Sequence, residues 1–140
     1  MAGPAIHEAC FAARLESLGE LRRFLEQAAG SAGLNRTQAL KLQLIAEELF
    51  VNTVRHGHGG GDAALVWVVL EVAGPSVRLD YIDQAPPFNS LTCAVAPLPA
   101  GTGESHRVGG LGVRLVRELT CSAEYAFLFG RNHTRLVLAG

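Results

Sequence analysis

Two runs of β-branched and aromatic residues, separated by a very short connection, constrain the fold of this chain most. They are residues 63–72, AALVWVVLEV, and residues 76–83, SVRLDYID. Such residues favour extended strands, and the AGPS segment between them is rich in turn formers. Because so short a connection joins antiparallel neighbours, the pattern predicts a β-hairpin near the middle of the chain.

A first amphipathic helix is predicted over residues 14–30, RLESLGELRRFLEQAAG. Its leucines recur at spacings of three and four, which is the helical period. Gly30 and Gly33 are expected to end it.

A second, longer helix is predicted over residues 34–57, LNRTQALKLQLIAEELFVNTVRHG. Asn35 or Thr37 is the candidate N-terminal cap, since both side chains can accept a backbone hydrogen bond there. Gly57 is the expected stop.

The remaining segments complete an α+β pattern. Residues 5–13 fit a short edge strand, residues 109–120 a helix that opens on glycines, and residues 122–130 and 133–139 a closing hairpin around GRNH. The order is strand, two helices, hairpin, loop, helix, hairpin. It predicts a two-layer α/β sandwich with helices packed on one face of a mixed, mostly antiparallel sheet.

Length and composition limit the classes of function. At 140 residues, with 49% apolar and 18% charged residues, the chain fits one compact domain. A formal net charge of -1 gives no general attraction to nucleic acid or to an anionic membrane, so we expect small ligands or proteins as partners. The apolar run AALVWVVL is too short to span a bilayer and the start lacks a signal-peptide pattern, which predicts a cytoplasmic protein. Widely spaced Cys10, Cys93 and Cys121 are expected to be reduced thiols.

Polar residues follow one stripe of the second predicted helix. Glu48, Asn52 and His56 recur every four residues and can face one ligand together. An asparagine oxygen suits Mg²⁺, and a nearby carboxylate can orient a hydroxyl or accept its proton. Spacing alone fits equally well a solvated face at Glu47 and Glu48 with Asn52 on the surface. His56 and His58 lack further ligands at zinc spacing, so His56 is interpreted as packing or capping the helix end.

Two further segments carry binding chemistry. Asp83 ends a strand and can accept a hydrogen bond from an exocyclic amino group such as that of adenine, although aspartate before a turn is also ordinary capping chemistry. Gly109, Gly110 and Gly112 lie where a loop becomes a helix, a place where backbone N–H groups bind phosphate; a flexible helix entry is the alternative. The long loop over residues 84–108 is expected to be functional or mobile.

Taken in order, these segments resemble the histidine-kinase-like ATPase superfamily and, within it, the anti-sigma-factor serine/threonine kinases. EELFVNTVRHG, DQAPPFN and GGLGVRLVRELT, with EY and GRN after them, carry the resemblance, which runs from about Ile6 to Leu138. It implies the Bergerat ATP-binding fold, one domain over residues 1–140, an ATP lid at about 85–108, and ATP with Mg²⁺ as cofactors.

The resemblance also implies roles for individual residues. Glu48 is the base or orienter for the attacking hydroxyl, Asn52 holds Mg²⁺, Asp83 binds adenine, and Ala85 stands where the family's first glycine box has glycine. The implied nucleotide-binding residues are Asn52, Asp83, Ala85, Arg107, Gly109, Gly110, Leu111, Gly112 and Thr134. Arg107 can reach the γ-phosphate or be merely solvated, and Thr134 matches the family's late threonine near adenine.

The implied function is an ATP-dependent kinase that phosphorylates a small STAS-type anti-sigma-factor antagonist and sequesters a sigma factor, with a homodimer possible. A binding module of the same fold without phosphoryl transfer is the alternative; Ala85 supports it, whereas Glu48 and Asn52 oppose it. The ATPase portion of a sensor histidine kinase would need a phosphoacceptor helix, and the first predicted helix contains no histidine.

Overall fold

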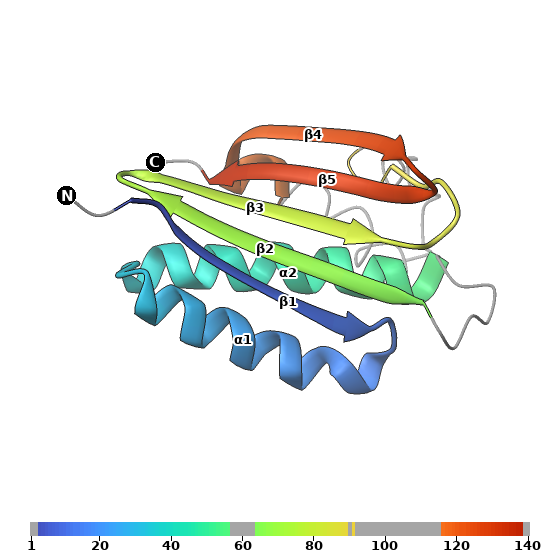
Figure 1. The fold of residues 1–140 in the computed structure, drawn as a ribbon, viewed down its shortest axis with the longest axis horizontal. Coiled ribbons are helices and arrows are strands. Elements are labelled where there is room, and N and C mark those ends of the chain that lie inside the picture. Colours follow the sequence, from blue (N-terminus) through green and yellow to red (C-terminus); the bar gives the residue numbers. More distant parts are fainter. Residues whose placement is uncertain (1–2, 57–63, 90, 92–115, 139–140) are drawn as a thin grey trace, which may run out of the picture.

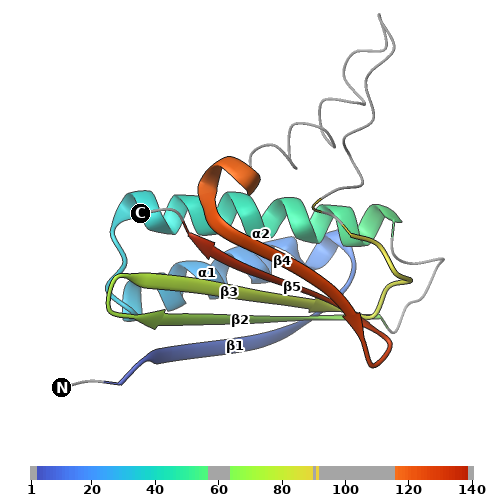
Figure 2. The same ribbon diagram turned by 90° about the horizontal axis from the view of Figure 1, so that it is seen from above.

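A computed structural model describes residues 3–56, 64–89, 91 and 116–138. Its elements are β1 (Ala5–Ala12), a short 3-10 turn η1 (Leu15–Ser17), α1 (Leu18–Ser31), α2 (Arg36–His56), β2 (Leu65–Ala73), β3 (Ser76–Asp83), β4 (Thr120–Leu128) and β5 (Arg131–Leu138). The strands form one five-stranded sheet in the order β1-β2-β3-β5-β4, with antiparallel pairing throughout. Both helices lie on the same side of the sheet (Figures 1 and 2). The predicted α+β two-layer fold is confirmed.

The core lies between the sheet and the two helices. Every second residue of the central strands is buried and faces the helices, as the burial pattern of β3 shows. The largest fully buried side chains are Phe50, Leu21, Leu25, Leu42, Ile45, Leu70, Leu79, Leu136, Val66, Val68 and Val77. Each stabilises the fold by roughly 1.5–3 kcal/mol relative to an exposed position. Because α2 contacts both β3 and β5, it crosses the centre of the sheet.

The helix ends agree with the predicted caps only in part. Asn35 caps α2, since its Oδ1 accepts from the Gln38 backbone N–H at 2.8 Å and the Gln38 side chain accepts from the Asn35 N–H at 3.1 Å. Thr37, the other candidate, lies inside the helix. Gly33 follows the end of α1 with φ +77°, a conformation that favours glycine, whereas Gly30 lies within α1 and does not end it.

The start of the first helix also differs from the prediction. Arg14 has extended backbone angles, and the chain passes through η1 before α1 begins at Leu18. The leucine period therefore located the helix correctly but placed its first turn too early.

The β2–β3 connection is the predicted hairpin. Ala73 pairs with Ser76, and Gly74 takes the positive φ of +59° that such a tight turn requires.

The β4–β5 hairpin turns earlier than the sequence suggested. Leu128 pairs with Arg131, so the turn consists of Phe129 and Gly130, and the predicted turn at GRNH is wrong. Asn132 and His133 are consequently strand residues of β5. Asn132 is therefore a buried residue of a strand and not part of the hairpin turn.

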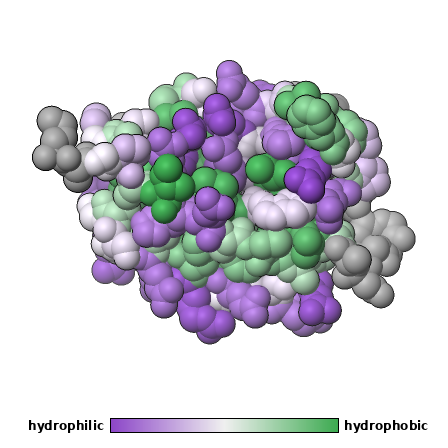
Figure 3. Space-filling model, in the orientation of Figure 1, coloured by the Kyte–Doolittle hydropathy of each residue, from purple (hydrophilic) through white to green (hydrophobic). Residues whose placement is uncertain are grey.

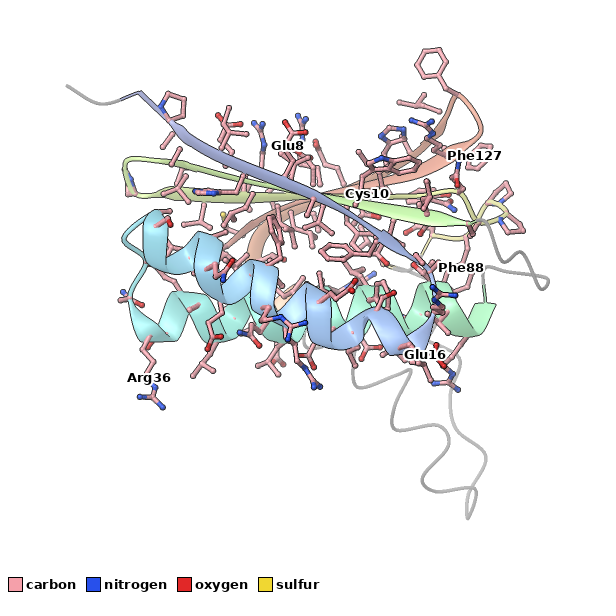
Figure 4. All side chains as sticks on the ribbon, turned by 60° about the horizontal axis from the view of Figure 1, so that its bottom comes forward. Glu8, Cys10, Glu16, Arg36, Phe88 and Phe127 are labelled. Carbon is pink, nitrogen blue, oxygen red and sulfur yellow. The ribbon has the colours of Figure 1, made fainter. Side chains whose placement is uncertain are left out.

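The outer face of the sheet, away from the helices, carries charges that pair with one another. Figure 4 shows Glu8 pointing away from the helices. Arg78 pairs with Glu71 and, at 3.3 Å, with Asp80, which also pairs with Arg135 at 2.7 Å. Such partly exposed pairs contribute little to stability individually.

The cysteines and the helices add two observations. Cys10 and Cys121 are free thiols, whereas Cys93 lies outside the described residues. None of the helices in the described ranges has both the length and the apolar character that crossing a membrane requires.

Candidate functional site

A small pocket lies where β3 ends, β5 begins and the last turns of α2 pass beside them. These ends of the three elements lie at the right of Figure 1. The sheet register creates it, because Asp83 stands opposite Asn132 and Tyr81 opposite Thr134 on the face that meets the helices. The lining residues are Leu49, Asn52, Thr53, Tyr81, Asp83, Ala85, Phe88, Asn132 and Thr134. Phe88 lies at the end of the molecule where α2 ends (Figure 4).

Asp83 forms the polar floor of this pocket and is only 7% exposed. Its Oδ1 accepts from the Asn132 amide at 2.8 Å and from the Ala85 backbone N–H at 3.0 Å, while its Oδ2 accepts from the Thr53 hydroxyl at 3.0 Å. The Ala85 contact is the turn-capping bond that the sequence allowed. A carboxylate has about four acceptor positions, so Oδ2 can accept one further hydrogen bond from a ligand.

Thr53 and Tyr81, which also line the pocket, extend this hydrogen-bond network. The Tyr81 hydroxyl lies 2.7 Å from Thr53 Oγ1, which also lies 3.0 Å from the Leu49 carbonyl oxygen. Burial raises the pKa of Tyr81 well above its usual value, so the phenol keeps its proton. Because each hydroxyl has one hydrogen, Tyr81 donates to Thr53 whenever Thr53 donates to Asp83.

Asn132 ties the segment after β3 to the sheet. Its Nδ2 lies 2.8 Å from Asp83 Oδ1 and 3.1 Å from the carbonyl oxygens of Ala85 and Pro86. Its Oδ1 accepts from the Phe88 backbone N–H at 3.0 Å and from the Tyr125 hydroxyl. With 3% of its surface exposed, Asn132 is among the most buried polar residues described.

Glu48 and Asn52 lie on the stripe of α2 beside the pocket. Asn52 is 4% exposed, which contradicts the interpretation of this asparagine as a surface residue. Glu48 is half-buried, and its Oε2 is buried without a hydrogen-bond partner among the described residues. Burial raises the pKa of Glu48, while a hydrogen bond from Asn52 and the charge of Arg55 lower it by less. An ionised carboxylate only accepts, so Asn52 uses an amide N–H here and keeps its oxygen for another partner.

Glu47 is occupied elsewhere. Arg22 of α1 contacts both of its carboxylate oxygens, at 2.8 and 3.2 Å. The two adjacent glutamates therefore have different surroundings: Glu47 links the helices, and Glu48 is hydrogen-bonded to Asn52, which lines the pocket.

The structure brings together four residues that the sequence predicted for nucleotide binding: Asn52, Asp83, Ala85 and Thr134. Ala85 is 6% exposed and has no positive φ, so the backbone here does not require glycine. Ala85 is one of the residues that line the pocket.

Sequence reasoning missed Thr53, Tyr81 and Asn132. Thr53 follows the predicted Asn52 directly, and Tyr81 is two residues before Asp83 on the same strand face. The alternation of Asn132, Thr134 and buried leucines in β5 was the available signal for Asn132.

The other predicted site residues lie outside the described residues. They are Arg107, Gly109, Gly110, Leu111 and Gly112, together with most of the predicted lid over 85–108 and the His58 of the rejected zinc motif. The prediction for the His56 side chain likewise stays untested. Within the described ranges, no group of three or more His, Cys, Asp or Glu residues could hold a metal ion.

Comparisons with known proteins agree with the overall fold. The profile described as "Histidine kinase-like ATPase domain" matches residues 11–138. The fold is similar to the crystal structure of the RsbU and RsbW domains of Rv1364c from Mycobacterium tuberculosis, with TM-score 0.67, 15% identity, and coverage of 95% of this chain and 31% of that chain. It is also similar to the Acinetobacter baumannii histidine kinase AdeS, with TM-score 0.51, 14% identity, and coverage of 95% and 67%.

These structural similarities concern the fold alone, and this chain spans about a third of the length of the first of those structures. A search of curated proteins finds no match. The profile match, in contrast, covers nearly the whole sequence and includes both α2 and the strand that ends at Asp83. The chain belongs to the histidine kinase-like ATPase family.

Proposed function

We propose that this chain binds ATP with Mg²⁺ and acts as a serine/threonine kinase of the anti-sigma-factor type. Its protein substrate would be a small STAS-type antagonist, and its second partner a sigma factor. The observation that carries the nucleotide part is the meeting of Asn52 and Asp83 in one pocket, with Glu48 bonded to Asn52. The partner-switching part is supported by the sequence motifs and by the fold that the chain shares with an RsbW-containing structure.

The Asp83 end of the pocket suits the adenine base. The carboxylate offers an acceptor and no donor, so it favours an exocyclic amino group over the carbonyl oxygen that guanine carries at the same position. The Thr53 and Asn132 hydrogen bonds hold the carboxylate in one orientation, which reduces the entropy lost on binding.

The Asn52 end suits a magnesium ion bridging phosphates. Mg²⁺ commonly takes one or two protein oxygens and fills its remaining positions with water and phosphate oxygens. The side-chain oxygen of Asn52, a residue that lines the pocket, fits that role. When bound, the ion would neutralise charge on the transferred phosphoryl group.

Glu48 is the proposed general base. Its raised pKa makes it a better proton acceptor than an ordinary surface carboxylate, and its Oε2 has no hydrogen-bond partner among the described residues. Glu47 is a weaker candidate because Arg22 already binds both of its oxygens.

A second candidate function is a nucleotide-independent binding module of the same fold. The narrow pocket and the Ala85 methyl group that lines it favour this candidate. Titration calorimetry distinguishes the two: folded parent protein that shows no heat with millimolar ATP and Mg²⁺ would contradict the kinase proposal and support the binding module.

Two substitutions then separate binding from chemistry. Glu48→Gln should keep ATP affinity within a few-fold yet slow phosphate transfer to the antagonist by roughly 10² to 10⁴, the usual effect of losing a general base. Asn52→Ala should lower both affinity and transfer, and its affinity loss should shrink when Mg²⁺ is omitted.

Glu47→Gln is the matched control, since it changes the neighbouring carboxylate in the same way. Radiolabelled transfer and calorimetry on the same preparations measure the two effects. Transfer at the parent rate by the Glu48→Gln protein would contradict the assignment of Glu48 as the base.

A further inference from the structure

Asn132 occupies an unusual position for an amide side chain. It is buried in a strand at the level of Asp83, and it contacts that carboxylate, the segment that follows it and the neighbouring strand β4. A polar group in such a place is costly unless all of its hydrogen bonds are made. Here the donor side and the acceptor side of the amide are both used.

The two ends of the Asn132 amide make different hydrogen bonds. The Nδ2 end donates toward Asp83 and toward the carbonyl oxygens of Ala85 and Pro86, while the Oδ1 end accepts from the Phe88 N–H. Residues 85–88 are therefore wrapped around one side chain. Ala85 and Phe88 are themselves pocket-lining residues, so this wrapping sets the shape of the pocket wall.

An amide meets these demands at this position, whereas leucine or an ionised carboxylate does not. Leucine would remove one of the two donors to Asp83 Oδ1 and the amide acceptor of the Phe88 N–H, which would keep its contact with the Tyr125 hydroxyl at 3.2 Å. A carboxylate would face Asp83 with a second negative charge. Neither residue can donate and accept at once, as asparagine does.

We propose that Asn132 is a positioning residue for nucleotide recognition: it fixes the orientation of Asp83 and holds residues 85–88 as the wall of the base pocket. This inference rests on the proposed nucleotide binding and adds to it a residue that acts through Asp83. The fixed carboxylate, with its remaining acceptor position, then selects the amino group of the base.

Asn132→Ala tests the selection. ATP affinity should fall roughly ten- to a hundredfold, because a buried carboxylate loses a donor and the wall loses its anchor. The ratio of the affinities for ATP and inosine triphosphate should also fall, since the latter carries a carbonyl oxygen in place of the amino group. A purely structural role would weaken both nucleotides alike and leave that ratio unchanged.

Asn132→Asp adds a readout that depends on pH. The new carboxyl would lie beside Asp83, and such a pair takes up one proton at a pH above that of an isolated aspartate. The shared proton restores a donor between the two residues. ATP binding by this variant should therefore be weak at about pH 8 and recover toward the parent value by about pH 5.5.

Other titratable groups lie around Asn132 in the described structure. Tyr81 and Asp83 come from β3, and Tyr125 comes from β4. Because the parent protein also contains these groups, the informative quantity is the difference between the pH profiles of ATP affinity for Asn132→Asp and for the parent. Asn132→Ala has no proton to share, so its profile should follow that of the parent.

Asn35→Asp is the matched control. It makes the same chemical change at an exposed helix cap, where aspartate is as suitable as asparagine. Calorimetry with ATP and with inosine triphosphate, run on all four proteins from about pH 5.5 to about pH 8, gives the affinities, and circular dichroism confirms folding at each pH.

The outcomes separate the two claims. If the parent binds ATP while Asn132→Ala keeps its affinity within about threefold and its base preference unchanged, the positioning role is wrong and the proposed function stands. If the parent binds no nucleotide, both are overturned. Acid recovery in Asn132→Asp but not in Asn132→Ala supports the positioning role, and its absence in a folded Asn132→Asp protein contradicts it.

Discussion

At the residue scale, the surroundings of Glu48 disfavour the ionised form of its carboxyl group. Burial raises its pKa, and one of its oxygens has no partner among the described residues. A folded-state pKa above the unfolded value means that the folded protein prefers the protonated carboxyl. The resulting stability is present below the unfolded pKa and is lost as pH rises through the folded pKa, so the ionised residue disfavours folding near neutral pH.

Glu48→Gln should therefore stabilise the protein at pH 7. We expect a gain of about 0.5 to 1 kcal/mol in the free energy of unfolding, kept small because the side chain is only half-buried. The gain should shrink as the pH approaches 4, just below the ordinary pKa of glutamate, because protonation of the parent's carboxyl is then favoured. Urea unfolding at both pH values measures it, and a loss of stability at pH 7 would contradict the pKa direction.

Arg55 provides a second test of the same carboxyl. Its positive charge lowers the pKa of Glu48, so Arg55→Ala should raise that pKa further. The acid limb of the pH profile for phosphate transfer should move to higher pH. Arg36→Ala removes the same charge from the other end of α2 and should leave the limb in place. Equal profiles for the two variants would show that Glu48 does not control the limb.

The sequence revealed some site residues and concealed others for a physical reason. The strand end at Asp83 and the helix stripe at Asn52 can be seen in local patterns, which left other interpretations open, and the family resemblance then implied their roles. Asn132 was not predictable, because its role depends on the register between β3 and β5, strands that are far apart in the chain. Asparagine is also a common turn former, and the GRN motif was therefore assigned to the hairpin turn.

At the element scale, the β4–β5 turn is an unusual tight connection. Phe129 is 96% exposed and has φ +53°, followed by Gly130 at +75°. Apolar side chains gather at this corner of the molecule, at the upper right in Figure 3. Two-residue turns with two positive φ values prefer Asn-Gly, so phenylalanine at the first position carries backbone strain.

Phe129→Asn should relieve this strain. The free energy of unfolding should increase by about 1 kcal/mol, because asparagine tolerates the left-handed conformation. Phe127→Asn, in the adjoining strand without a positive φ, is the control and should not stabilise. Thermal unfolding of the two variants makes the comparison, and a lower midpoint for Phe129→Asn than for the parent would contradict the expected strain.

At the scale of the whole molecule, the pocket exists only when distant segments meet. Its residues come from α2, β3, β5 and the segment that follows β3. The antiparallel sheet and the helix that crosses it bring them together. The sequence predicted the elements and their order but not that β5, the last strand, pairs with β3 while β4 forms the edge. Either strand of a hairpin can join a sheet, and local patterns do not decide which one does.

Nucleotide should consequently stabilise the entire described fold and not one part of it. ATP with Mg²⁺ at about a hundred times its dissociation constant should raise the free energy of unfolding by about 2.7 kcal/mol. Helix loss followed by circular dichroism and heat absorption followed by calorimetry should shift together. A shift in only one of the two signals would indicate that the site and the rest of the fold unfold separately.

Because Arg131 stacks on Trp67, the intrinsic fluorescence of this tryptophan should report on structural changes near the pocket. Trp67 is the chain's single tryptophan, and the Arg131 guanidinium carbon lies 4.4 Å from its ring centroid. Arg131 directly precedes Asn132, and Trp67 adjoins Val66, which pairs with Asp83. Any shift of β5 at the pocket would change the environment of the indole, so intrinsic emission should follow such shifts in unlabelled protein.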